Sequence, residues 1–242
     1  MESICPLPEN SVHVWYTLTP KVLENDLRAR YLGLLTPEER RRHDRFLQEK
    51  DRCQFLLGKV LVRTALSRYY PQAPQAWTFA TNRFGKPVVA NALAGRIPRF
   101  NLSHTEGLVA CVLARDFEVG IDVENVGRSV NLDIARRFFA PAEVAYLEKA
   151  AEDEQQRIFF LFWTLKEAYV KARGMGLSLP LEQFAFWLDT PPSITFEPAM
   201  QEDPTRWRFF LPDIASPAHQ VAVAVECGAA ETLDVEVRMM AL

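Results

Sequence analysis

Two long segments, one in each half of the chain, place apolar residues at the three-to-four spacing of a buried helix face. The first covers residues 51–69, and the second runs from about residue 155 to residue 173. Each comes after a segment with the alternation of a strand, Ser11–Leu18 in the first half and residues 119–124 in the second. We therefore expect a weak internal duplication, with the second half beginning near Val119.

Length and composition set the scale of the fold. The chain has 242 residues, more than the roughly 100–150 of a common single domain, so we expect two packed units. With 48% hydrophobic and 24% charged residues it has the composition of a globular protein. A net charge of −3 argues against nucleic acid as the main partner.

The cysteines and the apolar runs bear on the compartment. Four cysteines lie far apart without a CxxC pair, which indicates free thiols rather than a disulfide framework or a zinc site: Cys5, Cys53, Cys111 and Cys227. The first residues carry neither a basic nor an apolar signal region, and no apolar run approaches the ~20 residues of a membrane helix. These features predict a cytoplasmic protein without a membrane segment.

Helix boundaries are signalled in both halves. Thr36 is a suitable N-cap, Pro37 suits the first helical position, and Glu39 stands at the capping-box position. The second long helix should stop at Gly174 and Gly176, because glycine is the usual residue just beyond a helix.

The stretch between the long helices contains turn and strand signals. Residues 82–87 predict a turn, and residues 100–104 and 108–114 have the apolar character of strands. Residues 115–118 predict a hairpin loop that reverses the chain into the strand at 119–124.

Alternation in that strand places Gly120, Asp122 and Glu124 on one face. Two carboxylates should project side by side into a cleft, with Cα atoms roughly 6.5–7 Å apart. Oxygen-only ligands favour a hard cation such as Mg²⁺. An exposed strand face whose acids only contact water is the alternative that this spacing leaves open.

On the second long helix, Trp163, Glu167 and Lys171 share a face that is distinct from the apolar stripe. An i,i+4 salt bridge worth a few tenths of a kcal/mol is one interpretation. A third metal carboxylate beside a phosphate-binding ammonium is the other. Helix geometry alone favours the salt bridge.

Ser103 and His104 follow a short strand and offer a hydroxyl and an imidazole. They could contact a phosphate or form a nucleophile with its base, although adjacent side chains of a strand point in opposite directions. A capping serine and a partly buried histidine are the structural alternative. The sequence contains neither a GxGxxG nor a GxxxxGK[ST] pattern, which argues against a Rossmann site and a P-loop.

Taken together and in order, these segments resemble the Sfp-type phosphopantetheinyl transferases, and the resemblance covers nearly the whole chain up to about residue 229. The motifs that carry it are FGKP at 84–87, FNLSH at 100–104, VGIDVE at 119–124, RRFFAPAE at 136–143 and FWTLKEAYVKARGMGLSLPL at 162–181.

The resemblance implies an α+β fold of two similar subdomains related by pseudo-twofold symmetry. Residues 1–118 would form the coenzyme A-binding subdomain, and residues 119–242 would carry the metal and catalytic residues. Coenzyme A and Mg²⁺ would lie in the cleft between them. By the match to the family's motifs, the metal ligands are Asp122, Glu124 and Glu167.

The same match implies a coenzyme-binding role for a set of basic and polar residues: Arg42, Arg52, Lys86, Ser103, His104, Lys166 and Lys171. Lys86 and His104 would contact the phosphoadenosine and phosphate portions. Lys166 and Lys171 would lie near the pyrophosphate. Arg42 and Arg52 would be partners of the 3′-phosphate.

The implied reaction is the transfer of 4′-phosphopantetheine from coenzyme A to a serine of an acyl or peptidyl carrier protein by a monomeric enzyme. We expect Lys171 to stabilise the leaving group and Glu167 to be the candidate base. Two alternatives remain open at this point. A binding module that has lost catalysis would keep the fold, and a metal-dependent phosphatase would explain the acids but not the coenzyme motifs.

Overall fold

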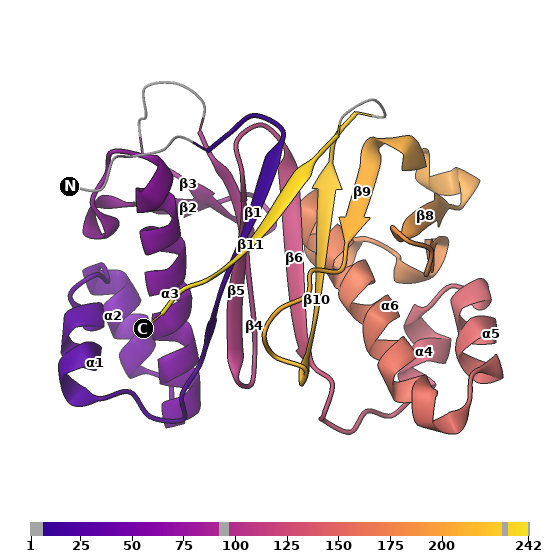
Figure 1. Cartoon of the computed structure of the whole chain (residues 1–242), viewed down its shortest axis with the longest axis horizontal. Helices are drawn as coiled ribbons and strands as arrows, with labels where there is room; N and C mark the ends of the chain where they lie inside the picture. Colours follow the sequence, from indigo (N-terminus) through magenta and orange to yellow (C-terminus); the bar gives the residue numbers. More distant parts are fainter. Residues whose placement is uncertain (1–6, 92–96, 229–231, 242) are drawn as a thin grey trace.

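The strand β1 (Ser11–Leu18) shows how the layers arise from the sequence, because both of its faces are buried. In the computed structural model, which describes residues 7–91, 97–228 and 232–241, Val12 and Val14 point into a core between two sheets. Trp15 points the other way, into a core under the helix α3 (Glu49–Tyr69). Figure 1 shows the resulting order of layers, with α3 on one outer side, α6 (Glu152–Arg173) on the other and the strands between them.

Two larger sheets and two small ones make up the β structure. The first sheet has the order β11–β1–β5–β4, with β11 (Asp234–Met239), β5 (Leu108–Ala114) and β4 (Arg99–Thr105). The second has the order β6–β10–β9, with β6 (Glu118–Asn125), β10 (His219–Glu226) and β9 (Trp207–Phe210). The two-stranded sheets are β2 (Phe79–Thr81) with β3 (Pro87–Val89), and β7 (Phe184–Trp187) with β8 (Ser193–Phe196).

Shorter helices complete the outer layers. They are α1 (Asn25–Leu32), α2 (Pro37–Asp44), α4 (Asp133–Phe138) and α5 (Pro141–Lys149). Single 3₁₀ turns lie at Pro74–Ala76, Gly176–Ser178, Leu181–Gln183, Pro198–Met200 and Pro204–Arg206. No helix in these described ranges combines the length and apolar composition needed to cross a bilayer.

The two halves repeat one succession of elements. β1, α3, the β2–β3 pair, β4 and β5 are followed by β6, α6, the β7–β8 pair, β9 and β10. The pairing repeats as well, because β5 lies between β1 and β4 just as β10 lies between β6 and β9. The expected α+β fold of two similar subdomains is therefore confirmed. The boundary between residues 118 and 119 stays a prediction, and β11 returns from the second half to pair in parallel with β1.

Several local expectations are confirmed. Thr36 accepts a hydrogen bond from Glu39 N, and Glu39 accepts one from Thr36 N, which completes the capping box of α2. The helix α6 ends at Gly174, whose φ of 60° is in the left-handed region that favours glycine. Cys53 and Cys111 are free thiols and buried, and Cys227 is buried as well, while Cys5 and the start of the chain lie outside the described residues.

The predicted hairpin at residues 115–118 is only half right. The chain does reverse there, but β5 and β6 belong to different sheets. Both edges of β5 are already paired, with β1 on one side and β4 on the other, so β6 has no backbone edge to join. Instead, Val119, Ile121 and Val123 pack face to face against the first sheet.

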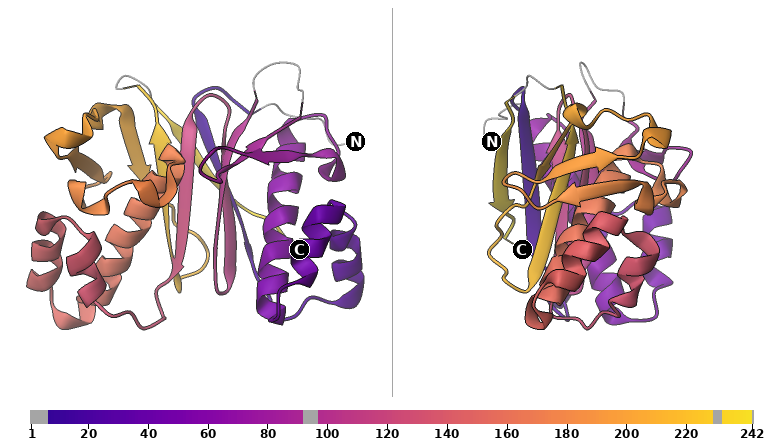
Figure 2. Two further views of the ribbon diagram at one scale, coloured as in Figure 1. Left: turned by 180° about the vertical axis from the view of Figure 1, so that it is seen from behind. Right: turned by 90° about the vertical axis from the view of Figure 1, so that its right-hand side faces the viewer.

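The two larger sheets lie side by side in the middle of the molecule (Figure 2). A ladder of side-chain hydrogen bonds joins them at the edges of β4 and β6. Ile121 N donates to Asn101 Oδ1 at 3.0 Å, and Val123 N donates to Ser103 Oγ at 3.3 Å. Asn125 N donates to Thr105 Oγ1, also at 3.3 Å. These bonds satisfy backbone N–H groups that would otherwise lie unpaired at an edge buried between the halves. We call this contact the seam.

We expect Gly120→Ala to destabilise the protein, because Gly120 lies where β6 touches α6. A Cβ atom at this position would come within 2.1 Å of Ala168 O and 2.3 Å of Ala172 N, both backbone atoms that cannot swing aside. Forcing α6 outward should lower the free energy of unfolding by about 1–3 kcal/mol or more. Denaturant unfolding measures this loss. Gly228→Ala is the matched control, since nothing lies within 4 Å of its Cβ position, and an equal effect of the two would contradict the packing argument.

Candidate functional site

The chemical groups of the two halves meet at the seam. Asp122 on β6 and Lys171 on α6 form an ion pair, with Lys171 Nζ 2.6 Å from Asp122 Oδ1. Ser103 on β4 joins them, because its Oγ lies 3.0 Å from Asp122 Oδ1 and 2.8 Å from Lys171 Nζ. The structure thus brings together three residues that the sequence places far apart.

The Ser103 hydroxyl is fully used in this group. It donates its one proton to Asp122 Oδ1 and accepts hydrogen bonds from Lys171 Nζ and Val123 N. A hydroxyl has one donor and two acceptor positions, so none remains. This bonding does not support the alternative in which Ser103 is a nucleophile activated by His104.

Asp122 is more enclosed than we expected. The sequence predicted a carboxylate facing a cleft, but only 5% of the residue is exposed. Its second oxygen, Oδ2, is buried and has no hydrogen-bond partner. A buried carboxylate oxygen without a partner is costly, and it marks a place where a cation or a donor group would be stabilised.

Glu124 and Glu167 complete an acidic group around Asp122. Burial and then the negative charge of Asp122 raise the pKa of both carboxyl groups above the ordinary value for glutamate. The negative charge of Glu124 is partly compensated by Arg128, 2.9 Å away, and that of Glu167 by the positive charge of Lys171. Glu167 therefore interacts with its helix neighbour Lys171 and also with the acids of β6, so the salt-bridge interpretation alone is incomplete.

The donor set of these three carboxylates suits a hard divalent cation. The partnerless Asp122 Oδ2, and the burial and mutual repulsion that raise the glutamate pKa values, favour added positive charge. Within the described residues, no three acidic, histidine or cysteine side chains are already gathered as a metal cluster. Two cationic side chains, Lys171 and Arg128, hold two of the acids instead.

A cavity of about 350 Å³ opens beside this group, and we call it the Lys86 cavity. Its walls come from the 84–87 turn, the start of β4 and the last turns of α6, and include Lys86, Leu102, Glu167 and Lys171. The ammonium of Lys86 contacts Ala172 O at 2.9 Å, and Val119 O and Glu118 at 3.2 Å each. Lys86 thus lines this cavity, and its charge already has three partners, while its contact with coenzyme A stays a prediction.

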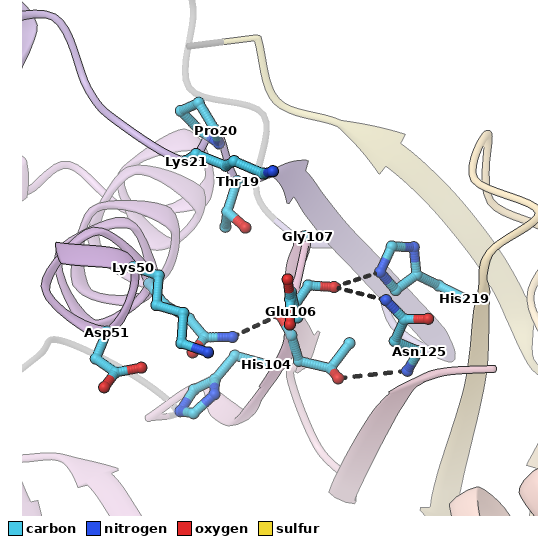
Figure 3. Close-up of a pocket in the computed structure, with 12 residues that line it drawn as sticks. Thr19, Pro20, Lys21, Lys50, Asp51, His104, Glu106, Gly107, Asn125 and His219 are labelled. Atoms are coloured by element: carbon cyan, nitrogen blue, oxygen red, sulfur yellow. Dashed lines mark hydrogen bonds between the residues drawn. The ribbon is translucent and has the colours of Figure 1, made fainter. Parts of the chain in front are cut away.

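A second cavity of about 600 Å³ lies at the other end of β4, and we call it the His104 cavity (Figure 3). One wall is formed by Thr19, Pro20 and Lys21. The remaining lining residues are Lys50, Asp51, Gln54, His104, Thr105, Glu106, Gly107, Asn125 and His219. His104 is solvent-exposed, yet partial loss of hydration and then the charge of Lys171 lower the pKa of its imidazole. His104 therefore lies close to the seam group as well as to this cavity.

Lys166 is not near the other site residues, and our expectation for it is corrected. Its side chain is fully buried, and its ammonium donates to Leu181 O at 2.8 Å and Phe184 O at 2.7 Å. It also forms an ion pair with Glu143 at 2.7 Å. Lys166 and Glu167 are neighbours in sequence, but they point to different sides of α6, so Lys166 ties the helix to α5 and β7 rather than facing a ligand.

Arg42 and Arg52 lie outside both cavities. Arg42 is exposed, with its guanidinium 5.4 Å from the centre of the Phe55 ring. Arg52 donates to Phe46 O at 2.8 Å and lies 3.5 Å from Glu49. Their contact with a 3′-phosphate stays a prediction.

Sequence reasoning missed two features of the site. Arg128 was not recognised as the partner of Glu124, although it follows at the i+4 position. Gln54, which stands where relatives often carry arginine, was given no contact of its own, but its amide donates to Thr105 O in the wall of the His104 cavity. Its position on the same helix face as Asp51 was the available signal.

Comparison with known proteins agrees with this geometry. Residues 118–225 match the family model of the 4′-phosphopantetheinyl transferase superfamily, and residues 24–116 match that of the 4′-phosphopantetheinyl transferase, N-terminal. The chain is 32% identical over 206 residues to 4′-phosphopantetheinyl transferase Sfp of Bacillus subtilis, covering 85% of this chain and 84% of that protein. It is 33% identical over 204 residues to 4′-phosphopantetheinyl transferase HetI of Nostoc, covering 83% and 82%. It is 34% identical over 195 residues to 4′-phosphopantetheinyl transferase psf-1 of Bacillus pumilus, covering 80% and 79%.

These relatives identify the chain, with its two-halved α+β fold, as a transferase. The chain belongs to the 4′-phosphopantetheinyl transferase superfamily.

We expect Glu167→Gln to stabilise the metal-free protein at neutral pH. The raised pKa of Glu167 means that the folded state holds a proton more tightly than the unfolded state. The protonation of Glu167 therefore adds to the free energy of unfolding below the pKa of about 4.3 that glutamate has in the unfolded chain. This contribution is lost as the pH rises through the pKa of Glu167 in the folded protein. In EDTA, thermal melting should show a higher midpoint for the variant near pH 7 and a shrinking difference toward pH 4. A variant that is less stable at pH 7 would show that the pairing with Lys171 outweighs burial and repulsion.

Proposed function

We propose that this enzyme transfers 4′-phosphopantetheine from coenzyme A to a serine of an apo acyl or peptidyl carrier protein, with Mg²⁺, and releases adenosine 3′,5′-bisphosphate. The observation that carries this proposal is the buried Asp122, which has a partnerless oxygen and lies against Ser103 and Lys171 in a chain of this superfamily. Family membership supports coenzyme A as the donor.

Asp122, Glu124 and Glu167 would hold the Mg²⁺ ion. A bound divalent cation would supply compensation for the negative charge of the pyrophosphate. The burial of Asp122 and the raised pKa of the two glutamates support this assignment, since burial and mutual repulsion both disfavour the charged carboxylates and a cation would offset them.

The chain's own residues would then arrange the transfer. The carrier serine oxygen forms a bond to the pantetheine-side phosphorus of the coenzyme A pyrophosphate. The bond from that phosphorus to the bridging oxygen breaks, and this oxygen leaves as part of adenosine 3′,5′-bisphosphate. Lys171 donates hydrogen bonds to the oxygens on which charge develops, as it does to Asp122 in the free protein. Glu167 takes the serine proton, and its raised pKa brings it closer to the working pH than an ordinary glutamate.

The nucleotide end would occupy the Lys86 cavity, where Lys86 and Lys171 provide positive charge. Arg42 and Arg52 would be partners of the 3′-phosphate outside it, and Ser103 and His104 would orient the phosphates. Lys166 has no part in this arrangement because it is enclosed. We also propose that the protein acts as a monomer in the cytoplasm, where the buried free thiols of the described chain would stay reduced.

The proposed reaction predicts a defined product. Purified protein incubated with coenzyme A, Mg²⁺ and several apo-carrier proteins should increase the mass of at least one carrier by one phosphopantetheine group, as measured by intact-protein mass spectrometry. A carrier whose acceptor serine is replaced by alanine is the control. Release of phosphate without modification of a carrier would indicate a phosphatase, and coenzyme binding without either product would indicate a binding module.

Glu167→Gln separates the proposed roles of this residue. Glutamine keeps the length of the side chain and a weak oxygen ligand but cannot accept the serine proton. If Glu167 is both ligand and base, the transfer rate should stay about 10²–10⁴ below wild type at saturating Mg²⁺. Recovery of most of the rate at high Mg²⁺ would leave it the role of a ligand alone. Near-normal rates at low Mg²⁺ would remove Glu167 from the active site.

A further inference from the structure

The carboxyl end of α6 is held by the first half of the chain. Lys171 lies in the last turn of this helix, and Glu167 lies one turn before it. The last C=O groups of a helix have no partner within the helix. At this end, Ala172 O and Gly174 O both accept hydrogen bonds from the turn at residues 82–87. The left view of Figure 2 shows this turn, between β2 and β3, reaching toward α6.

Asn82 makes one of these bonds with its side chain. Its Nδ2 donates to Gly174 O at 3.0 Å, while its Oδ1 accepts from Phe84 N and Lys86 N at 2.9 Å each. Only one orientation of the carboxamide serves both sides, because a backbone N–H cannot accept and a C=O cannot donate. Asn82 therefore orders the turn with one atom and binds the end of α6 with another.

Lys86 adds a second bond from the same turn. Its Nζ donates to Ala172 O at 2.9 Å and to Val119 O at 3.2 Å. A cation is favourable at the carboxyl end of a helix. Because Val119 lies at the start of β6, the turn holds the end of α6 and the start of β6 together. These two elements carry the acids and the lysine of the site.

The contact between the turn and the helix is close. A Cβ atom at Gly174 would come within 2.8 Å of Lys86 Cδ and 3.1 Å of Asn82 Nδ2. Nearer its middle, α6 is tied to the second half by Lys166, which donates to Leu181 O and Phe184 O. The helix is thus anchored to one half at Lys166 and to the other at Gly174. Glu167 and Lys171 lie between the two anchors.

We propose that Asn82 is a positioning residue for the transfer, whose bond to Gly174 O fixes the end of α6 and so the place of Lys171 and Glu167 beside Asp122. Asn82 itself is not among the residues that line the Lys86 cavity, so it acts through α6 rather than on a ligand. This inference rests on the proposed function, because it takes these three residues as the reacting group.

Asn82→Asp removes the bond to α6 and keeps the turn. A carboxylate still accepts from Phe84 N and Lys86 N, but it has no donor for Gly174 O. At saturating coenzyme A, Mg²⁺ and carrier protein, kcat should fall roughly ten- to a hundredfold, as expected when reacting groups are misplaced. An effect of the new charge on coenzyme A binding would appear in KM instead.

Asn91→Asp is the matched control. The Asn91 carboxamide also accepts from a backbone N–H, that of Thr78, and donates to a backbone C=O, that of Ala76, but both partners are in the first half. This variant undergoes the same atomic change and should keep the wild-type kcat. Equal losses in the two variants would overturn the inference.

Gly174→Ala disturbs the same contact from the helix without a change of charge. Gly176→Ala is its reference, because φ is 58° at Gly176 and 60° at Gly174, while nothing lies within 4 Å of the Cβ position of Gly176. We expect kcat to be about tenfold lower for Gly174→Ala than for Gly176→Ala. Adding Asn82→Asp to Gly174→Ala should cause little further loss, since both changes release one contact. Losses that multiply would show two independent contacts and contradict the proposal.

Hydrogen exchange of the metal-free protein separates this role from a local role in the turn. In Asn82→Asp, the amides of residues 171–174 should exchange faster than in the wild type, because the end of the helix opens more often. Asn91→Asp should match the wild type there. Faster exchange confined to residues 82–87 would refute the positioning role. If the wild type modifies no carrier protein, the proposed function fails, and the exchange data still decide whether Asn82 holds α6.

Discussion

The structure depends on the seam, where side chains of β4 replace the partner strand that β6 lacks. Asn101, Ser103 and Thr105 accept hydrogen bonds from backbone N–H groups spaced along β6. A direct backbone ladder would merge the two sheets into one and close the space between the halves. Side chains as acceptors hold the sheets together and leave room for functional groups at the junction.

Ser103 connects this framework to the chemistry. The hydroxyl that accepts from the backbone of Val123 also donates to Asp122 and accepts from Lys171. A shift of one half against the other would therefore move the acid and the lysine together. The geometry of the site is set by the same contact that sets the relation of the halves.

Sequence reasoning succeeded where structure is local and failed where it depends on what packs against an element. The capping box at Thr36 and the acid face of β6 follow from residues a few positions apart. The role of Lys166 was inferred from the family motif, which does not tell which of two neighbouring polar residues faces a ligand on a helix that is buried on most sides. Neither the seam nor the burial of Asp122 could be predicted, because β4 contributes both from outside the local sequence.

The crossing of β11 has a consequence for biosynthesis. The outer edge of β1 pairs with residues 234–239, which leave the ribosome only after all the elements between the two strands. Until then, one row of its N–H and C=O groups has no strand partner, which exposes a template for association with other chains. The first half can assemble its own core early, but its sheet is complete only after the whole second half has been synthesised.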